Sequence, residues 1–441
     1  MKKIVLILLL ILFSFNSFAE LKITDFKQEV EFTDFGKIVN VKIKAKVELE
    51  SRNYYYKGWD YIFDSKQKIE VSEAKVIGKN FKTSFGNNTL KFEFDKSFNG
   101  DNLEFVFKYL EFEDDIPEYI RQEYVAIPAF AKGANGELKV KIPDNYVVYS
   151  LNPDFKQNYN TYIWNNKISD KGFNQYFYLT LKQATWKAEV LTNIIGKDKI
   201  SKIDIELPSY FKNGNNLISD YQIKTNYDED LTTIKEKDNY INVSLNKING
   251  SIIQVKLSAT LQNDLSSKAW IRLMPSDYLY VDRDLALDLG NVVYDIARNS
   301  PNEPLHIAIA KFVNKHIKYT DSYFGKELTT REIFNAGKGV CSHYAQLYND
   351  LLRTAGIPSI IVSGMSYDIE HKKFESHAWN LVYANGEWLS IDPTWGLYSG
   401  ILPISHIFLY LGEREVINYT VYNANVADFS TEIKRYIKFI K

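Results

Sequence analysis

Alternating hydrophobic and polar side chains dominate the chain from Glu20 to about Ser150. Residues 39–49 read Val-Asn-Val-Lys-Ile-Lys-Ala-Lys-Val-Glu-Leu, which is a strict period of two. Successive side chains of a strand point to opposite faces of a sheet, so this pattern predicts a strand with one face in a core and the other in water. Similar stretches recur at 91–94, 103–109 and 138–143, separated by turns rich in Gly and Asn. The sequence therefore predicts a β-sandwich domain over residues 20–150.

The same alternation continues over residues 151–275, with clear examples at 176–181, 203–207 and 252–257. It predicts a second β-rich domain, and it fits the second half of one large sandwich equally well. After Pro275 the period of two gives way to the spacing of a helix, which predicts a domain boundary near residue 275.

Two capping patterns predict helices in the following region. Ser300 to Glu303 combine a capping serine, a proline at the first helical position and a glutamate at the third, and apolar residues then recur on one face. This predicts a helix over 301–318. Thr329 to Glu332 repeat the capping pattern and predict a short helix that ends at Gly337.

Cys341 is the only cysteine of the 441 residues, so it has no intramolecular disulfide partner. It follows the glycine-rich turn 337–339 and precedes apolar residues at helical spacing, up to a stop at Gly356 and Pro358. A cysteine at a helix N-terminus is stabilised as thiolate by the helix amide groups. The sequence thus predicts a reactive thiol at the start of a helix.

A predicted hairpin places a base and an acid together. Asn385-Gly386 is a strong signal for a two-residue turn, and it pairs Trp379 with Asp392 and His377 with Thr394. In that register His377 and Asp392 are diagonal neighbours on one face, with Cβ atoms under about 8 Å apart. Such a pair supplies the base and the orienting acid that a nucleophilic cysteine needs.

Several motifs over about 320–400 resemble the transglutaminase-like family of papain-type folds, and they occur in the family's order. They are Gly-Lys-Gly-Val-Cys at 337–341, Leu-Arg-Thr-Ala-Gly-Ile-Pro at 352–358, Val-Ser-Gly at 362–364, His-Ala-Trp at 377–379 and Trp-Leu-Ser-Ile-Asp-Pro-Thr at 388–394. The resemblance implies a papain-like transglutaminase core. Together with the alternation upstream and the change of period near residue 275, it predicts an α+β fold: an N-terminal β-sandwich region, a core at 276–412 and a C-terminal extension at 413–441. It also implies Cys341 as nucleophile, His377 as base and Asp392 as orienting acid.

The other candidate residues carry weaker signals. His343 points roughly 200° away from Cys341 on a helix, which favours a packing or surface role. Tyr319 and Asn335 are candidates for an oxyanion partner beyond the Cys341 N–H. His406 lies in an apolar run, and a structural or solvent role is favoured over catalysis. Because no His, Cys or Asp set has zinc spacing and no acidic loop has calcium spacing, we expect no cofactor and no metal.

The first nineteen residues have the pattern of a secretory signal peptide. Lys2 and Lys3 precede an apolar run from Ile4 to Phe13, and Ser17-Phe18-Ala19 forms a small-x-small cleavage pattern. Removal of residues 1–19 leaves 52 basic and 55 acidic side chains, a formal charge of −3. This charge does not favour nucleic-acid binding. We expect an exported protein, periplasmic or extracellular, with no membrane association once the signal peptide is removed.

Together these features predict an exported cysteine-dependent acyl-transfer enzyme acting on amide bonds of proteins or peptides, including those of the cell envelope. The sequence leaves open whether the product arises by hydrolysis or by transfer to an amine, and it gives no oligomeric state. A catalytically silent protein that binds or scaffolds through its β-domains is the alternative.

Overall fold

The computed structural model describes residues 19–33, 36–49, 56–63, 68–98, 101–112, 117–150, 155–212, 216–237, 240–265, 273–412 and 415–440. The predicted signal peptide at 1–19 lies outside the described residues, apart from Ala19 at its end. Contacts divide the chain into two compact units, one with ranges 1–116, 122–144 and 151–177, and one with ranges 117–121, 145–150 and 178–441. The predicted domain ranges remain predictions. Among the described residues, no helix has the length and apolar character needed to cross a membrane.

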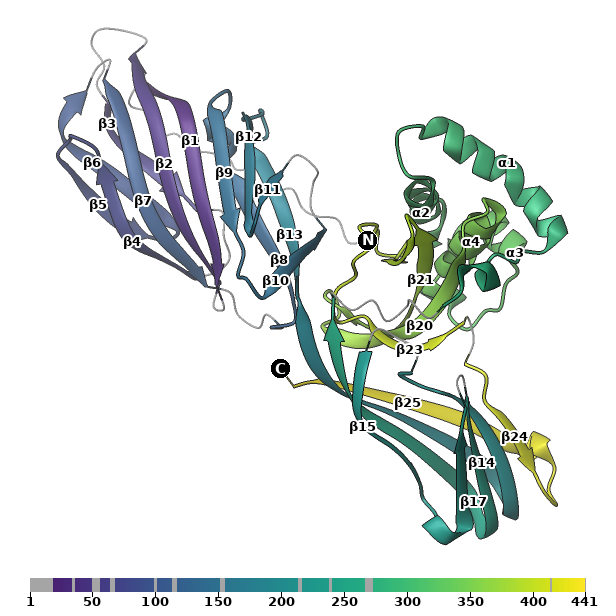
Figure 1. Cartoon of the computed structure of the whole chain (residues 1–441). Coiled ribbons are helices and arrows are strands. Elements are labelled where there is room, and N and C mark those ends of the chain that lie inside the picture. Colours follow the sequence, from purple (N-terminus) through teal and green to yellow (C-terminus); the bar gives the residue numbers. More distant parts are fainter. Residues whose placement is uncertain are drawn as a thin grey trace. The chain divides into compact units, whose positions relative to one another are not determined.

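The chain up to residue 181 is built almost entirely of strands (Figure 1). They form three sheets, with orders β11-β12-β9-β1-β2-β7-β4, β3-β6-β5 and β10-β13-β8. The strands are β1 (Ala19–Thr33), β2 (Gly36–Leu49), β3 (Tyr56–Ile62), β4 (Lys68–Val76), β5 (Phe81–Gly86), β6 (Thr89–Phe98), β7 (Asn102–Phe112), β8 (Ile120–Ile127), β9 (Asn135–Lys141), β10 (Tyr146–Ser150), β11 (Lys156–Asn158), β12 (Thr161–Lys167) and β13 (Phe173–Leu181).

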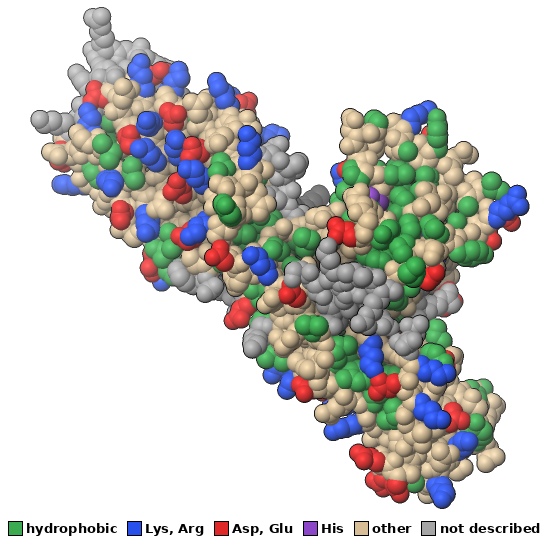
Figure 2. Space-filling model, in the orientation of Figure 1, with side chains coloured by type: hydrophobic (Ala, Val, Ile, Leu, Met, Phe, Trp, Pro, Cys, Tyr) green, Lys and Arg blue, Asp and Glu red, His purple; other side chains and the backbone are tan. Residues whose placement is uncertain are grey.

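In the first unit, the alternation of hydrophobic and polar residues in the sequence corresponds to an alternation of buried and exposed side chains. Val39, Val41 and Ile43 of β2 are buried, whereas Asn40, Lys42 and Lys44 between them are more exposed. The solvent side carries cross-strand ion pairs, and Figure 2 shows basic and acidic side chains interleaved on the displayed face of this unit. The predicted β-rich character of this region is confirmed.

A second β-structure belongs to the other unit and is built on two very long strands. Strands β14 and β17 pair antiparallel from Gln183↔Asp264 to Pro208↔Tyr240. The predicted strands at 203–207 and 252–257 lie within them. Residues 413–441, predicted as an extension, supply two strands that pair with β14. The sheet comprises β14 (Gln183–Pro208), β15 (Asn216–Thr225), β16 (Thr232–Glu236), β17 (Tyr240–Asp264), β24 (Asn418–Val421) and β25 (Phe429–Phe439).

The remaining part packs helices on a four-stranded sheet of order β22-β21-β20-β23 (Figure 1). Helix α4 is the central helix of this part. It contacts strands β20 and β21 of the sheet and also helices α1, α2 and α3. The predicted α+β class is confirmed. The elements are α1 (Arg283–Asn299), α2 (Leu305–His316), β18 (Lys318–Tyr319), α3 (Thr330–Ala336), β19 (Lys338–Gly339), α4 (Cys341–Thr354), β20 (Ser359–Asp368), β21 (Lys373–Ala384), β22 (Glu387–Ile391) and β23 (Ile407–Leu411).

Of the predicted helix starts, one is wrong and the others are confirmed. Helix α2 begins at Leu305 with Pro304 as its N-cap, and Ser300 instead forms the C-cap of α1. Pro304 explains the difference, because a proline disfavours helical backbone at the preceding residue. The capping box of Thr329 is present, and α4 begins at Cys341 as predicted.

The predicted hairpin forms, but its ladder is shorter than expected. Asn385 and Gly386 have φ of 55° and 85°, as the predicted turn requires. Pairing follows the predicted register up to Asn380↔Ile391 and stops there. Asp392 then makes an isolated bridge with Leu397, so the predicted pairings of Trp379 with Asp392 and of His377 with Thr394 are wrong.

Candidate active site

Cys341 is the first residue of α4 and has little exposure to solvent. The residue is 8% exposed and packs against Ala345 of the same helix, Ile361 of β20 and Ala378 of β21. The first N–H groups of a helix lack an acceptor four residues back; in α4 the His343 N–H donates to the Val340 carbonyl at 2.9 Å, and Cys341 and Ser342 precede it at the helix start. The thiol therefore lies where backbone N–H groups can stabilise negative charge.

His343 fixes the local geometry of this helix start. Its Nδ1 accepts a hydrogen bond from the Val340 N–H at 3.1 Å, so the ring proton lies on Nε2, which contacts the Lys326 carbonyl oxygen at 3.0 Å. A Cβ on Gly339 would lie 2.6 Å from the His343 Cβ. Burial lowers the pKa of His343, which favours this neutral form. Of the packing and surface roles that the sequence left open, the surface role is wrong: His343 is buried, and its side chain also caps the start of α4.

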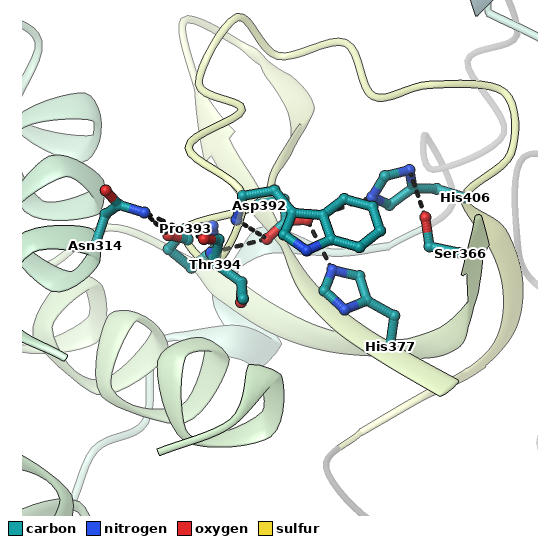
Figure 3. A network of polar contacts seen from close by, with 8 residues as sticks. Asn314, Ser366, His377, Asp392, Pro393, Thr394 and His406 are labelled. Atoms are coloured by element: carbon teal, nitrogen blue, oxygen red, sulfur yellow. Dashed lines mark hydrogen bonds and ion pairs between the residues drawn. The ribbon is translucent and has the colours of Figure 1, made fainter. Parts of the chain in front are cut away.

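His377 and Asp392 form a buried hydrogen-bonded pair (Figure 3). The Nε2 of His377 lies 2.7 Å from Oδ2 of Asp392, and the two residues are 7% and 0% exposed. The other carboxylate oxygen, Oδ1, accepts the N–H groups of Thr394 and Trp395 at 2.8 and 3.2 Å. The predicted proximity is therefore present, although a tight turn at Asp392 produces it instead of the predicted strand pairing.

The charges of the pair support each other. Burial disfavours the charged form of His377, but the charge and hydrogen bond of Asp392, with a further contribution from Cys341, raise the His377 pKa to about 10. Burial likewise opposes ionisation of Asp392, yet His377 and His406 hold the pKa of that carboxyl well below its usual range. Because Nε2 faces Asp392, Nδ1 is the nitrogen left for the Cys341 thiol.

Neighbouring side chains hold the two halves of the site together. Asn380 of β21 donates from Nδ2 to the Ala345 carbonyl of α4 at 3.0 Å, which links the strand of His377 to the helix of Cys341. Asn314 of α2 donates to the carbonyl oxygens of Pro393 and Thr394 (Figure 3). These contacts fix the backbone on both sides of the candidate residues.

Trp395 covers the imidazole of His377. Their ring centroids lie 4.3 Å apart with an interplanar angle of 18°, and the indole is 38% exposed. Trp395 is therefore partly accessible, whereas the His377–Asp392 pair that it covers is buried. Shielding of this kind strengthens the electrostatic interaction between the two side chains.

His406 is a further member of the site, although its sequence context favoured a structural or solvent role. It precedes β23, and its Nε2 lies 3.3 Å from Oδ2 of Asp392 (Figure 3). No spacing signal connects it to His377, since β23 reaches the site by pairing with β20.

The two oxyanion candidates differ in their position. Tyr319 belongs to β18, which pairs with β19 just before Cys341, and burial, with a contribution from the Cys341 charge, raises the Tyr319 pKa. Asn335 is exposed on α3.

Two groups of side chains within the described ranges have the composition and spacing of a possible metal site. They are His377 with Asp392 and His406, and Asp368 with His371 and Glu375, each with ligand atoms within 4.8 Å of one another. In the first group the hydrogen bonds already account for the arrangement. The second group is partly exposed, and Lys373 binds Glu375 at 2.8 Å.

The sequence of this region matches a known family. Residues 292–393 match the transglutaminase-like superfamily, and this range includes all three candidate residues. The kyphoscoliosis peptidase of Mus musculus is 35% identical over 71 residues, which cover 15% of this chain and 11% of that protein. A protein-glutamine gamma-glutamyltransferase of Pseudomonas aeruginosa is 38% identical over 74 residues, covering 14% and 11%. The chain thus matches about a tenth of the length of these relatives.

Solved structures resemble the chain more distantly. A putative cysteine protease from Cytophaga hutchinsonii has a TM-score of 0.43 at 13% identity, covering 59% of this chain and 91% of that one. The periplasmic domain of TgpA from Pseudomonas aeruginosa has a TM-score of 0.28 at 14% identity, covering 49% and 88%.

Proposed function

We propose, from the premise that residues 292–393 belong to the transglutaminase-like superfamily, that the protein is a cysteine-dependent acyl-transfer enzyme acting on amide bonds of proteins or peptides. The family prediction made from the motifs is confirmed over this range. The observation that carries the proposed activity is the 2.7 Å contact of His377 with Asp392 directly beside the helix that begins at Cys341. These three residues are the proposed catalytic residues.

In the proposed acylation step, the Cys341 thiolate attacks the carbonyl carbon of an amide. The carbon–sulfur bond forms, and the developing oxyanion is stabilised by N–H groups at the start of α4. His377, protonated at Nδ1, gives this proton to the departing nitrogen as the carbon–nitrogen bond breaks. A thioester and a free amine result. Asp392 retains its negative charge and keeps the imidazole oriented throughout.

In the proposed second step, His377 acts as a base. Its Nδ1 takes a proton from a water molecule or from a primary amine, which then attacks the thioester carbonyl. Water gives a carboxylic acid and an amine gives a new amide; both restore the Cys341 thiolate beside protonated His377. The outcome depends on how well water is excluded from the thioester.

The proposed substrate is a protein or peptide outside the cytoplasm, in the periplasm or the extracellular space. This part rests on the signal-peptide pattern of residues 1–19 and on the relatives named above. Binding of the substrate by the β-rich regions is part of the proposal. A catalytically silent protein would share the fold but would lack an activated thiol.

Thiol alkylation tests the proposal without knowledge of the substrate. Because Cys341 is the only cysteine, iodoacetamide incorporation reports on it alone. At about pH 6, where an ordinary thiol is protonated, we expect the folded protein to react much faster than the urea-unfolded chain, and we expect His377→Ala to remove this advantage. His306→Ala, which changes another buried histidine, serves as control and should react like the parent. Equal rates for the folded and unfolded parent would contradict the proposal.

A second measurement separates hydrolysis from transfer. A glutamine-containing peptide is incubated with the protein, with and without a primary amine, and the products are identified by mass. An amine adduct that depends on Cys341 assigns transfer, whereas free acid alone, even with excess amine, assigns hydrolysis for that peptide.

A further inference from the structure

His406 is a buried imidazole with polar partners on both ring nitrogens (Figure 3). Its side chain lies 3.3 Å from Oδ2 of Asp392 through Nε2 and 3.2 Å from Oγ of Ser366 through Nδ1. The residue is 6% exposed, and Ser366, on the central strand β20, is 1% exposed. The steps proposed for the reaction leave both side chains without a role.

The position of the ring proton follows from these partners. An ionised carboxylate only accepts hydrogen bonds, so the proton of His406 must lie on Nε2. Burial, with a contribution from the charge of His377, lowers the pKa of His406 although Asp392 and the Pro403 backbone raise it, and the lowered pKa favours the neutral ring. In the neutral ring Nδ1 is then an acceptor, and it receives the hydroxyl proton of Ser366. The chain Ser366–His406–Asp392 therefore has one consistent direction of donation.

We propose that His406 is a positioning residue of the acyl-transfer site, which donates its Nε2–H to Asp392 and is held in the required tautomer by Ser366. This inference rests on the proposed function, because it assigns His406 a part in the cycle of His377. It gives the reaction a fourth side chain, which acts through Asp392 and does not touch the substrate.

The contribution of His406 differs between the two states of His377. When His377 is protonated, its charge compensates the buried carboxylate directly. When His377 is neutral, as in the thioester intermediate, Asp392 keeps its charge with two backbone N–H groups and two neutral imidazole donors. Loss of the His406 donor therefore destabilises the second state more than the first. The pKa of His377 would rise, so His377 would hold its proton more tightly and would be a poorer acid towards the departing nitrogen.

The other titratable groups around this pair are few among the residues the structure describes. Cys341 faces His377 from α4 and raises the His377 pKa. Tyr398 follows Asp392 in the chain; burial, with a contribution from the Asp392 charge, raises its pKa to about 12, so it stays neutral. Replacement of Cys341 by alanine removes the thiol contribution and resembles the thioester state, in which the thiolate is absent.

The test is an NMR titration of the full-length chain carrying Cys341→Ala and isotope-labelled histidine. The chain has six histidines, and single His→Gln variants assign their signals. We expect His406 to carry its proton on Nε2. His406→Leu should move the titration midpoint of His377 upward by roughly half a pH unit, the size of one neutral hydrogen bond. His406→Gln, whose amide can donate in place of Nε2, should return the midpoint towards that of the parent, and Ser366→Ala should give a smaller upward shift.

His306→Leu provides the control, because it removes a buried imidazole away from the pair and should leave the midpoint unchanged. An unchanged or lowered midpoint in His406→Leu would overturn the proposal. If that variant does not fold, the tautomer of the unsubstituted His406 decides, since a proton on Nδ1 contradicts the inferred direction of donation. The titration needs no turnover. Expected shifts in a protein whose Cys341 is no more reactive than a free thiol would support the role of His406 and overturn the proposed function.

Discussion

Opposite charges meet in two very different settings in this molecule. On the solvent side of the first unit, Lys27 and Glu137 of adjacent strands lie 2.9 Å apart with side chains 47% and 25% exposed. In the candidate active site, His377 and Asp392 lie 2.7 Å apart with side chains 6% and 0% exposed. The distances are similar, but water screens the first pair and not the second. We infer that burial, and not geometry, makes the second pair suitable for chemistry.

The two settings also differ in what surrounds the charges. The exposed pair belongs to a ladder along the parallel strands β1 and β9, where Glu29 with Lys139 and Glu31 with Lys141 repeat the arrangement. A lost partner there is replaced by water or by a neighbour. The buried carboxylate of Asp392 instead accepts hydrogen bonds from four fixed donors. If one of these donors is lost, water cannot replace it.

The largest expected effect is that of Asp392→Asn. The asparagine keeps the shape of the side chain but cannot compensate a protonated His377, and its amide favours the wrong imidazole tautomer. We expect the turnover proposed here to fall on the order of 10³- to 10⁴-fold, and we expect the pH 6 alkylation advantage of Cys341 to disappear. Asp350→Asn is the matched control, because Asp350 is a partly buried carboxylate of α4 whose pKa is raised by burial. Activity within tenfold of the parent in Asp392→Asn would contradict the role given to the buried pair.

The sequence predicted this pair because its signals are local. The Asn385-Gly386 turn fixes the register of β21 and β22, so this register depends only on residues that are close in the sequence. The end of the ladder was missed, although it too has a local cause: Asp392 accepts the N–H groups two and three residues ahead, which is a turn that Asp-Pro sequences favour.

His406 could not be predicted in this way. It reaches Asp392 only because β23 pairs with β20, and residues 392 and 406 are joined by a loop without regular spacing. For the same reason the sequence predicted short strands in the second unit but gave no sign that β14 and β17 are continuous over 26 and 25 residues. Alternation of hydrophobic and polar residues identifies which face of a strand is buried. The length of a strand and its partner strands depend instead on tertiary contacts between residues far apart in the sequence.

A smaller effect is expected from Gly339→Ala, which tests how far the geometry of the buried active site depends on packing at the start of α4. The new Cβ would lie 2.6 Å from the Cβ and 3.0 Å from the Cγ of His343, so the capping ring must move. We expect a loss of stability of about 1–3 kcal/mol and slower alkylation of Cys341. Gly290→Ala in α1 is the control, because its Cβ would meet no atom within 4 Å. Equal alkylation rates in both variants would show that the helix start tolerates displacement of His343.

The pH dependence of stability separates the two settings directly. Because the folded pKa of His377 is about 10, above the unfolded value of about 6.5, its pairing stabilises the fold fully below about pH 6.5 and progressively less up to pH 10. The urea midpoint of His377→Gln should therefore fall furthest below that of the parent near pH 6, and the difference should shrink towards pH 10. A difference that stays constant over this range would show that the imidazole contributes only packing.

The smallest effect is expected for Lys27→Gln, which removes the cation of the exposed pair. Since solvent screens this pair and both side chains lose rotamer freedom in forming it, we expect a change in unfolding free energy below about 0.5 kcal/mol. The change should decrease further at 1 M salt, where the Debye length is about 3 Å. Urea unfolding at low and high salt measures it, with Lys27→Arg as the charge-preserving control. A change of several kcal/mol would mean that an exposed pair of similar geometry rivals the buried one, and the distinction drawn from burial would then fail.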